Sequence, residues 1–227
     1  MVEFVDVDEY GQLSVTDLHR RLHDGGPGAG DVKLIRHDPR ADPRRVGQSR
    51  RGGRCGRPRG PVPFLRDACQ SVGQMPIDVD RIGCGLLSAT GRCFLRGPRG
   101  TGFLYVRGSI LDTLEPPFLD LHAATWTAPD RYVIRPDARR FETWETNYAA
   151  KIGLGVAVDY ALSWGLEAIE ARVTTLADRL RAQLQSLDGV HVHDQGQRRC
   201  GIVTFTVDGA PAQDVQCREG AASGPAR

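Results

Sequence analysis

Three short apolar segments between residues 61 and 107 constrain the fold of this chain more than any other feature. They read PVPFLRD, GCGLLSAT and GTGFLYVR, and glycine-rich or polar stretches separate them. Each has the length and the bounding turn residues of a buried strand. A similar segment, DVKLI, precedes them at residues 31–35. Several buried strands with helical connections predict an α/β fold built on a mostly parallel sheet with flanking helices.

The second half of the chain carries the clearest helical patterns. Residues 148–164 are almost uniformly apolar and predict a buried helix. Residues 166–187 predict an amphipathic helix with a charged outer face, and residues 201–207 alternate like a half-exposed strand. Residues 111–140 contain prolines and predict a long surface connection. The apolar positions of the amphipathic helix are Ile169, Val173, Leu176, Leu180, Leu184 and Leu187.

The N-terminal part joins a predicted helix to a segment that lacks the apolar residues of a core. Residues 12–24 predict a short amphipathic helix with Ser14 or Thr16 as its cap. Residues 36–60 contain nine arginines, and Val46 is their one branched aliphatic residue. This segment cannot bury enough apolar surface to offset the entropy of ordering it, so we expect disorder.

Two interpretations of residues 36–60 stay open at this level. A solvated or non-native insert is the simpler one. An arginine arm that binds nucleic-acid phosphates is the other, although without aromatic residues it would bind without specificity. With this insert, residues 1–150 are expected to form a partial large α/β domain. Residues 151–227 are expected to hold connecting helices and the start of a smaller α+β domain.

Composition narrows the class of protein. The net charge of +2 favours neither nucleic acid nor a membrane as the partner. The six cysteines have no CxxC spacing, which disfavours a zinc site. Residues 1–12 lack the apolar run of a secretory signal, and no stretch has the length of a membrane span. We therefore expect a cytoplasmic protein.

Two polar stretches adjoin the predicted strands. Asp67 follows a strand, where open α/β sheets bind ligands, and its carboxylate would attract a protonated heterocycle. Capping of the next turn is the alternative role for this aspartate. The stretch SATGRCFLRGPRGTG places Ser88, Thr90 and Arg92 beside glycines, a combination that suits a phosphate group. A structural turn explains the second stretch equally well.

Together, these stretches and RFETWETN at residues 140–147 resemble the class V aminotransferase and cysteine desulfurase group of fold-type I enzymes. The resemblance covers most of residues 1–35 and 61–216. It implies the cofactor pyridoxal 5′-phosphate, an amino acid substrate and a homo-oligomer with shared active sites. It assigns the ring nitrogen of the cofactor to Asp67, the ring oxygen to Gln70 and the phosphate to Thr90 and Arg92.

Cys93 is the sharpest departure from the family. It stands where the family has the lysine that binds the cofactor aldehyde and moves the proton at the substrate α-carbon. A thiol forms no stable imine and no ammonium acid. Lys33 and Lys151 are the only lysines in the chain, and Lys151 lies in a different predicted segment. Asn147 is the one family match in its stretch, and a helix cap explains it equally well.

The resemblance therefore predicts an incomplete and inactive relative with a residual cofactor site. Family chemistry would be amino-group transfer, desulfuration or elimination on amino acids. The alternative is a non-catalytic partner that docks on a full-length homologue through residues 148–164. The family's N-terminal half has no counterpart before Met1, and its C-terminal domain stops early. We also expect residues 36–60, and the segment 217–227, to come from a shifted reading frame, which reading the DNA in the other frames would test.

Overall fold

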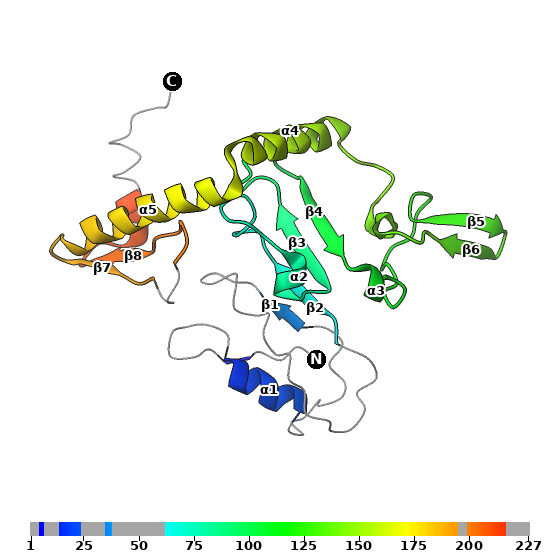
Figure 1. Cartoon of the computed structure of the whole chain (residues 1–227), viewed down its shortest axis with the longest axis horizontal. Helices are drawn as coiled ribbons and strands as arrows, with labels where there is room; N and C mark the ends of the chain where they lie inside the picture. The colour runs from blue at the N-terminus through cyan, green and yellow to red at the C-terminus, as the bar shows by residue number, and fades with distance from the viewer. Residues whose placement is uncertain (1–4, 7–13, 24–34, 38–61, 195–198, 217–227) are drawn as a thin grey trace.

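A four-stranded sheet lies at the centre of the computed structural model, which describes residues 5–6, 14–23, 35–37, 62–194 and 199–216 (Figure 1). The strands follow one another in space in the order β1-β2-β3-β4, which is also their order in the chain. Their bounds are Ile35–His37 for β1, Phe64–Asp67 for β2, Leu86–Thr90 for β3 and Gly102–Val106 for β4.

Strand direction confirms a mostly parallel sheet, with one exception. β1, β2 and β3 run parallel, and β4 runs antiparallel to β3. The loop 91–101 joins β3 to β4, and a connection this short contains no crossover helix, so the chain has to reverse direction.

The first strand differs from its predicted position. β1 ends at His37, so the first two residues of the segment expected to be disordered pair with β2 instead. Three predicted segments lie outside the described residues: the rest of the segment 36–60, the predicted strand residues before Ile35, and residues 217–227. The expectations of disorder and of a shifted reading frame there stay predictions.

The core of the sheet lies around β2 and β3. Its buried side chains include Ala68, Leu87 and Ala89, with Ile82 and Cys84 from the segment between the two strands. Helix α2, Val79–Ile82, supplies part of this segment. Asp78 caps the helix by accepting the backbone N–H groups of two residues in its first turn. Because this core holds β2 and β3 together, it also fixes the positions of the residues that follow them.

Helix α1, Val15–His23, lies in the predicted segment 12–24. The Ser14 hydroxyl accepts the Asp17 N–H at 3.1 Å, so Ser14 is the cap.

The segment expected to be a surface connection carries its own secondary structure. It contains the hairpin strands β5, Ala124–Ala128, and β6, Arg131–Ile134. Helix α3, Gly108–Leu111, ends where the segment begins, and the 3-10 helix η1, Ala138–Phe141, lies at its end. Figure 1 shows the hairpin extending away from the central sheet. The buried guanidinium of Arg140 donates to the carbonyls of Arg135, Leu111 and Leu114, and these bonds join η1 to the residues around α3.

Two long helices follow, and the first corrects the prediction of a buried helix. Helix α4 spans Tyr148–Trp164, as the sequence indicates, but only Ala150 and Ala161 are buried along it. The exposed side chains include a row with a spacing of four residues, which we call the α4 ridge. The α4 ridge consists of Tyr148, Ile152, Val156, Tyr160 and Trp164. Within the described chain, no element covers this row.

Helix α5, Leu166–Gln185, is amphipathic as predicted, but its buried face differs from the prediction. Ala177 and Arg181 are buried, whereas Leu176, Leu180 and the following Leu187 are exposed. The hairpin of β7, Val190–Val192, and β8, Phe205–Val207, packs beside α5 (Figure 1). The strand predicted at residues 201–207 is therefore confirmed only for its last three residues.

No single helix among the described residues is long and apolar enough to cross a membrane. The pair α4 and α5 reaches the required length and composition only when the two are joined across a bend of 80°.

Candidate functional site

Asp67 and Thr90 lie at the same edge of the sheet, because each is the last residue of one of two adjacent parallel strands. Asp67 is in register with Ser88, and the Ala68 N–H donates to the Ser88 carbonyl at 2.8 Å. The Asp67 carboxylate also accepts the backbone N–H of Cys69 at 3.1 Å. The aspartate therefore closes the next turn, and this role is compatible with a ligand at the same edge of the sheet.

The turn after β2 contains Gln70 and ties the site to the C-terminal part of the chain. The Gln74 side chain is 1% exposed and donates to the backbone carbonyl of Gln70. Its other end accepts the Gly201 N–H at 3.0 Å. Sequence reasoning overlooked Gln74, because its partner is 127 residues away and no local pattern indicates the pairing.

Cys69 is a second residue that sequence reasoning overlooked. Burial, followed by hydrogen bonding to the Asp67 carboxylate and the charge of that group, raises the pKa of the Cys69 thiol to about 11. Contact with the Thr90 backbone acts in the opposite direction. The thiol is therefore protonated at neutral pH and lies between the two strand ends. The sequence feature that could have identified Cys69 as a site residue is its position two residues after Asp67.

The loop after β3 carries Arg92 and Cys93 and packs against α4. The Gly97 N–H donates to the Gly91 carbonyl at 2.8 Å, which closes the loop on itself. A Cβ at Gly91 would lie 2.7 Å from Cδ1 of Leu154, so α4 packs closely against the backbone of this loop. Arg92 is exposed and Cys93 is half-buried.

The five residues assigned by resemblance fall into two groups in the structure. Asp67, Thr90 and Cys93 lie at or just beyond one edge of the sheet, and Gln70 lies in the turn that follows β2. Arg92 projects from an exposed position of the next loop. The assigned roles of these residues stay predictions.

The donor set at this edge fits pyridoxal phosphate in its non-covalent contacts. Asp67 offers a carboxylate for a protonated ring nitrogen, and Gln70 offers an amide for the ring oxygen. Thr90 and Arg92 offer a hydroxyl and a guanidinium for the phosphate. An amine is the one group that the described part of this edge lacks. Lys151, the only lysine among the described residues, contacts the Glu142 carboxylate at 3.4 Å.

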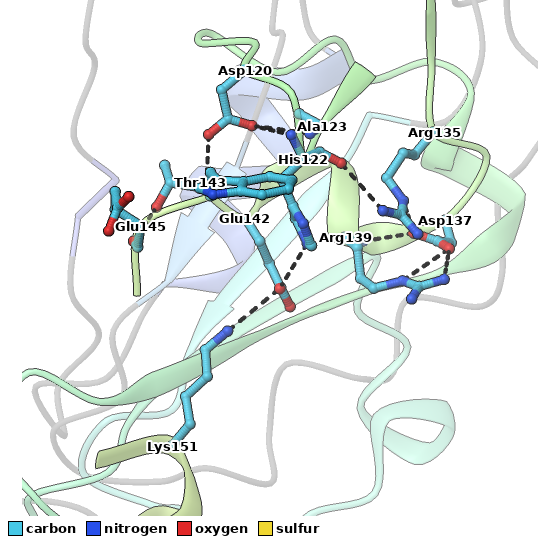
Figure 2. A network of polar contacts seen from close by, with 11 residues as sticks. Asp120, His122, Ala123, Arg135, Asp137, Arg139, Glu142, Thr143, Glu145 and Lys151 are labelled. Carbon is cyan, nitrogen blue, oxygen red and sulfur yellow. Dashed lines mark hydrogen bonds and ion pairs between the residues drawn. The ribbon is translucent and has the colours of Figure 1, made fainter. Parts of the chain in front are cut away.

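A second polar network joins the hairpin β5–β6 to α4 (Figure 2). Asp120 accepts the backbone N–H groups of His122, Ala123 and Trp144 at 2.8, 3.0 and 2.7 Å. These hydrogen bonds, the one from Trp144 above all, hold the pKa of the Asp120 carboxyl below its usual value. The Asp120 carboxylate thus connects the start of the hairpin to the segment before α4.

The same network continues to the first turns of α4. The Glu142 carboxylate lies 3.4 Å from Nε2 of His122 and 3.4 Å from Nζ of Lys151 (Figure 2). The Asn147 side chain accepts the Ala150 N–H at 3.0 Å and caps the helix, as the simpler interpretation of this residue expected. These contacts give the network a structural role, which is to orient the start of α4.

Comparisons with known proteins agree with this geometry. Residues 59–218 match the family model described as "Aminotransferase class-V". A probable cysteine desulfurase of Methanothermobacter thermautotrophicus is 33% identical over 152 residues, which cover 67% of this chain and 38% of that protein.

Solved structures also resemble this chain, one of them over nearly its whole length. The apo structure of cysteine desulfurase from Thermococcus onnurineus NA1 matches with a TM-score of 0.77 and 24% identity, over 97% of this chain and 54% of that one. A mutant of C-DES with glycine covalently linked to its PLP cofactor matches with a TM-score of 0.64 and 26% identity, over 71% of this chain and 43% of that one. This chain thus spans about half, or less, of the length of these relatives.

Proposed function

Since this chain belongs to the class-V aminotransferase family, we propose that the sheet edge at Asp67 and Thr90 binds pyridoxal phosphate. The observation that carries the proposal is the position of these two residues at the ends of adjacent parallel strands. Open α/β sheets bind ligands at this edge. The fold agrees with the family, because the sheet is a partial fold-type I arrangement.

Each side chain has a distinct task in this proposal. Asp67 pairs with the protonated ring nitrogen and keeps the ring electron-poor, while Gln70 donates to the ring oxygen. Thr90 and Arg92 bind the phosphate. When bound, the cofactor supplies an electron sink for chemistry at the α-carbon of an amino acid. The C-DES mutant with glycine linked to the cofactor supports an amino acid as the second ligand of the site.

Cys93 occupies the position of the family lysine in this proposal, and its thiol leaves the site without turnover. A thiol neither tethers the aldehyde as a stable imine nor returns a proton as an ammonium group does. Lys151 does not replace the missing amine, since it contacts Glu142 at the start of α4. The chain would therefore hold the cofactor and an amino acid without completing transamination or desulfuration.

An absorbance titration with pyridoxal phosphate tests both parts of the proposal. We expect the unaltered chain to bind the cofactor without a covalent link, and Asp67→Asn to weaken this binding. Cys93→Lys should form a covalent adduct with the cofactor. Borohydride reduction should make this adduct permanent, and mass spectrometry should locate it at residue 93. Cys93→Arg is the matched control, because it adds the positive charge without a reactive amine. Turnover of an amino acid by the unaltered chain would refute the proposed loss of activity.

The α4 ridge supports a second part of the proposal, which is association with another subunit. Its apolar and aromatic side chains form a continuous exposed row on a helix, and such a row is typical of an interface. We propose that a second copy of this chain, or a full-length homologue, packs against it.

Size-exclusion chromatography with and without a full-length homologue tests this association. Val156→Glu on the α4 ridge should abolish it, because it would bury a charge in the contact. Thr175→Glu, at an exposed position of α5, is the control and should leave it unchanged. If the chain elutes as a monomer at all concentrations, with and without the homologue, this part of the proposal is contradicted.

A further inference from the structure

Two cysteines lie on facing turns at the sheet edge that holds Asp67 and Thr90. Cys69 follows β2 by two residues, and Thr90 follows Ser88, the register partner of Asp67, by two residues. Adjacent strands of a sheet lie about 4.8 Å apart, so Cys69 is beside Thr90. Its thiol contacts the Asp67 carboxylate and the Thr90 backbone, as the causes of its raised pKa indicate.

The loop that carries Cys93 packs directly on the turn that carries Cys69. Gly73 closes that turn with a φ of +92°, and a Cβ there would lie 2.6 Å from the backbone N of Leu95 and the backbone C of Phe94. The two backbones therefore touch one residue away from Cys93. The Arg96 N–H donates to the Cys93 carbonyl at 3.1 Å, which holds Cys93 in a tight turn.

Accessibility separates these two thiols from the core cysteine. Cys69 and Cys93 are half-buried, whereas Cys84 is fully buried in the core of the sheet. All three are free thiols. Cys93 is also among the groups whose proximity raises the pKa of Cys69, so the two side chains lie within range of electrostatic interaction. Both residues at the sheet edge are therefore more accessible to a small oxidant than Cys84 is.

We infer that Cys69 and Cys93 form a redox modification site in which a reversible disulfide closes the cofactor-binding edge of the sheet. The oxidant is a hydroperoxide. One peroxide molecule converts the Cys93 thiol to a sulfenic acid and leaves as water or an alcohol. The Cys69 sulfur then attacks the Cys93 sulfur, the S–S bond forms, and the sulfenic hydroxyl leaves as water with the proton of Cys69.

The environment of Cys69 suits the resolving role. Its raised pKa and its contact with the Asp67 carboxylate make it a slow nucleophile toward peroxide, so we assign the peroxide step to Cys93 and the resolving step to Cys69. The bond would lie between Asp67 and Thr90, which are the contacts for the ring nitrogen and the phosphate. This consequence rests on the proposed function, because it treats that edge as the cofactor site.

Peptide mapping of the full chain tests the disulfide without reference to the cofactor. After treatment with hydrogen peroxide and alkylation under non-reducing conditions, we expect one linked peptide pair that joins Cys69 to Cys93 and disappears on reduction with dithiothreitol. Cys69→Ser and Cys93→Ser should each abolish the pair, while Cys200→Ser should retain it. A linkage between any other two cysteines, or over-oxidised Cys93 with a free Cys69, would overturn the inference.

A parallel titration with pyridoxal phosphate separates this result from the proposed function. Oxidised protein should bind the cofactor about tenfold more weakly or worse, the loss expected when one hydrogen bond to a charged group is broken. Reduction should restore binding. If the reduced chain does not bind pyridoxal phosphate, the proposed function is refuted. The peptide mapping still tests the disulfide in that case, because it does not depend on the cofactor. Unchanged binding by the oxidised chain would refute closure of the site.

Discussion

Helices α4 and α5 meet at Gly165, yet they place opposite kinds of side chain in contact with the rest of the molecule. The apolar helix α4 leaves its ridge in solvent, and Ile152 on this ridge is 70% exposed. The charged helix α5 buries Arg181, whose side chain is 3% exposed. The difference shows that the apolar composition of a helix does not by itself cause burial. A helix face is buried only where another element packs against it.

Packing partners explain this contrast. The hairpin β7–β8 packs on α5, and Arg181 donates to the carbonyls of Cys200 and Ile202 and to Asp194. Helix α4 contacts the loop after β3, where Leu154 approaches Gly97, Pro98 approaches Gly153 and the Arg96 guanidinium lies 5.6 Å from the centre of the Tyr160 ring. The α4 ridge nevertheless stays exposed, because no helix or strand of the described chain packs against it.

The largest expected effect is on α5. Arg181→Ala should lower the free energy of unfolding by about 3–5 kcal/mol, because it leaves a buried carboxylate without its cationic partner and two backbone carbonyls without their donor. That carboxylate is Asp194, whose side chain is 7% exposed and lies 2.6 Å from the guanidinium. Urea denaturation followed by circular dichroism measures the loss. Arg172→Ala, at an exposed position of the same helix, is the control and should change stability by less than about 0.5 kcal/mol. If Arg181→Ala and Arg172→Ala lowered the free energy of unfolding equally, the proposed importance of the buried arginine in α5 would be contradicted.

A smaller effect is expected at the start of α4. Asn147→Ala should cost about 1 kcal/mol, since it removes the side chain that accepts the Ala150 N–H. Asn147→Asp keeps an acceptor and should retain most of the stability. Urea denaturation of both variants gives the difference. No loss in the alanine variant would mean that α4 unfolds separately from the rest of the chain.

Acid should weaken the contact between α5 and the β7–β8 region. Burial raises the pKa of Asp194, but hydrogen bonds from Thr204 and Arg181 outweigh it and hold the pKa below its usual value. The carboxylate therefore contributes stability above the unfolded-state pKa of about 3.9, and this contribution is lost as the pH falls through the lower folded-state pKa. Urea midpoints between about pH 7 and about pH 3 measure this loss. Asp194→Asn should be less stable at neutral pH and less sensitive to acid; an identical pH dependence would contradict this account.

The smallest effect on the stability of the monomer is expected on the α4 ridge. Ile152→Ala should change the free energy of unfolding by less than about 0.5 kcal/mol, because the side chain is already in water. Leu87→Ala, in the core of the sheet, removes a side chain that is 1% exposed and should cost about 2–5 kcal/mol. The free energy of unfolding of both variants is measured by urea denaturation, at a dilution chosen so that sedimentation gives a monomer. A large loss for Ile152→Ala in the monomer would mean that the chain itself covers the ridge.

Local patterns were sufficient for several elements. β2, β3 and β4 lie within the three apolar segments, since a short buried strand needs only a few apolar residues between turns. The bounds of α4 were also predictable, and the cap of α1 was narrowed to Ser14 or Thr16, because both depend on neighbours within one or two helical turns. The hairpin β5–β6 was missed because prolines nearby suggested a connection without structure.

The candidate site divides in the same way. Asp67 and Thr90 could be placed at one edge because parallel strands end on the same side of a sheet. Gln74 and Cys69 could not be identified, since their importance depends on contacts with Gly201 and with the loop after β3.

The sequence by itself determined most of the strands and helices, and it determined that residue 93, which we propose as the position of the family's lysine, is a cysteine. Only the tertiary structure decided that α4 exposes its apolar row, that α5 buries a cation and that the turns carrying Cys69 and Cys93 pack together beside Asp67. The physical reason is range. Strand and helix formation depends on residues a few positions apart, whereas burial, charge pairing and thiol proximity depend on segments that meet only after the chain has folded.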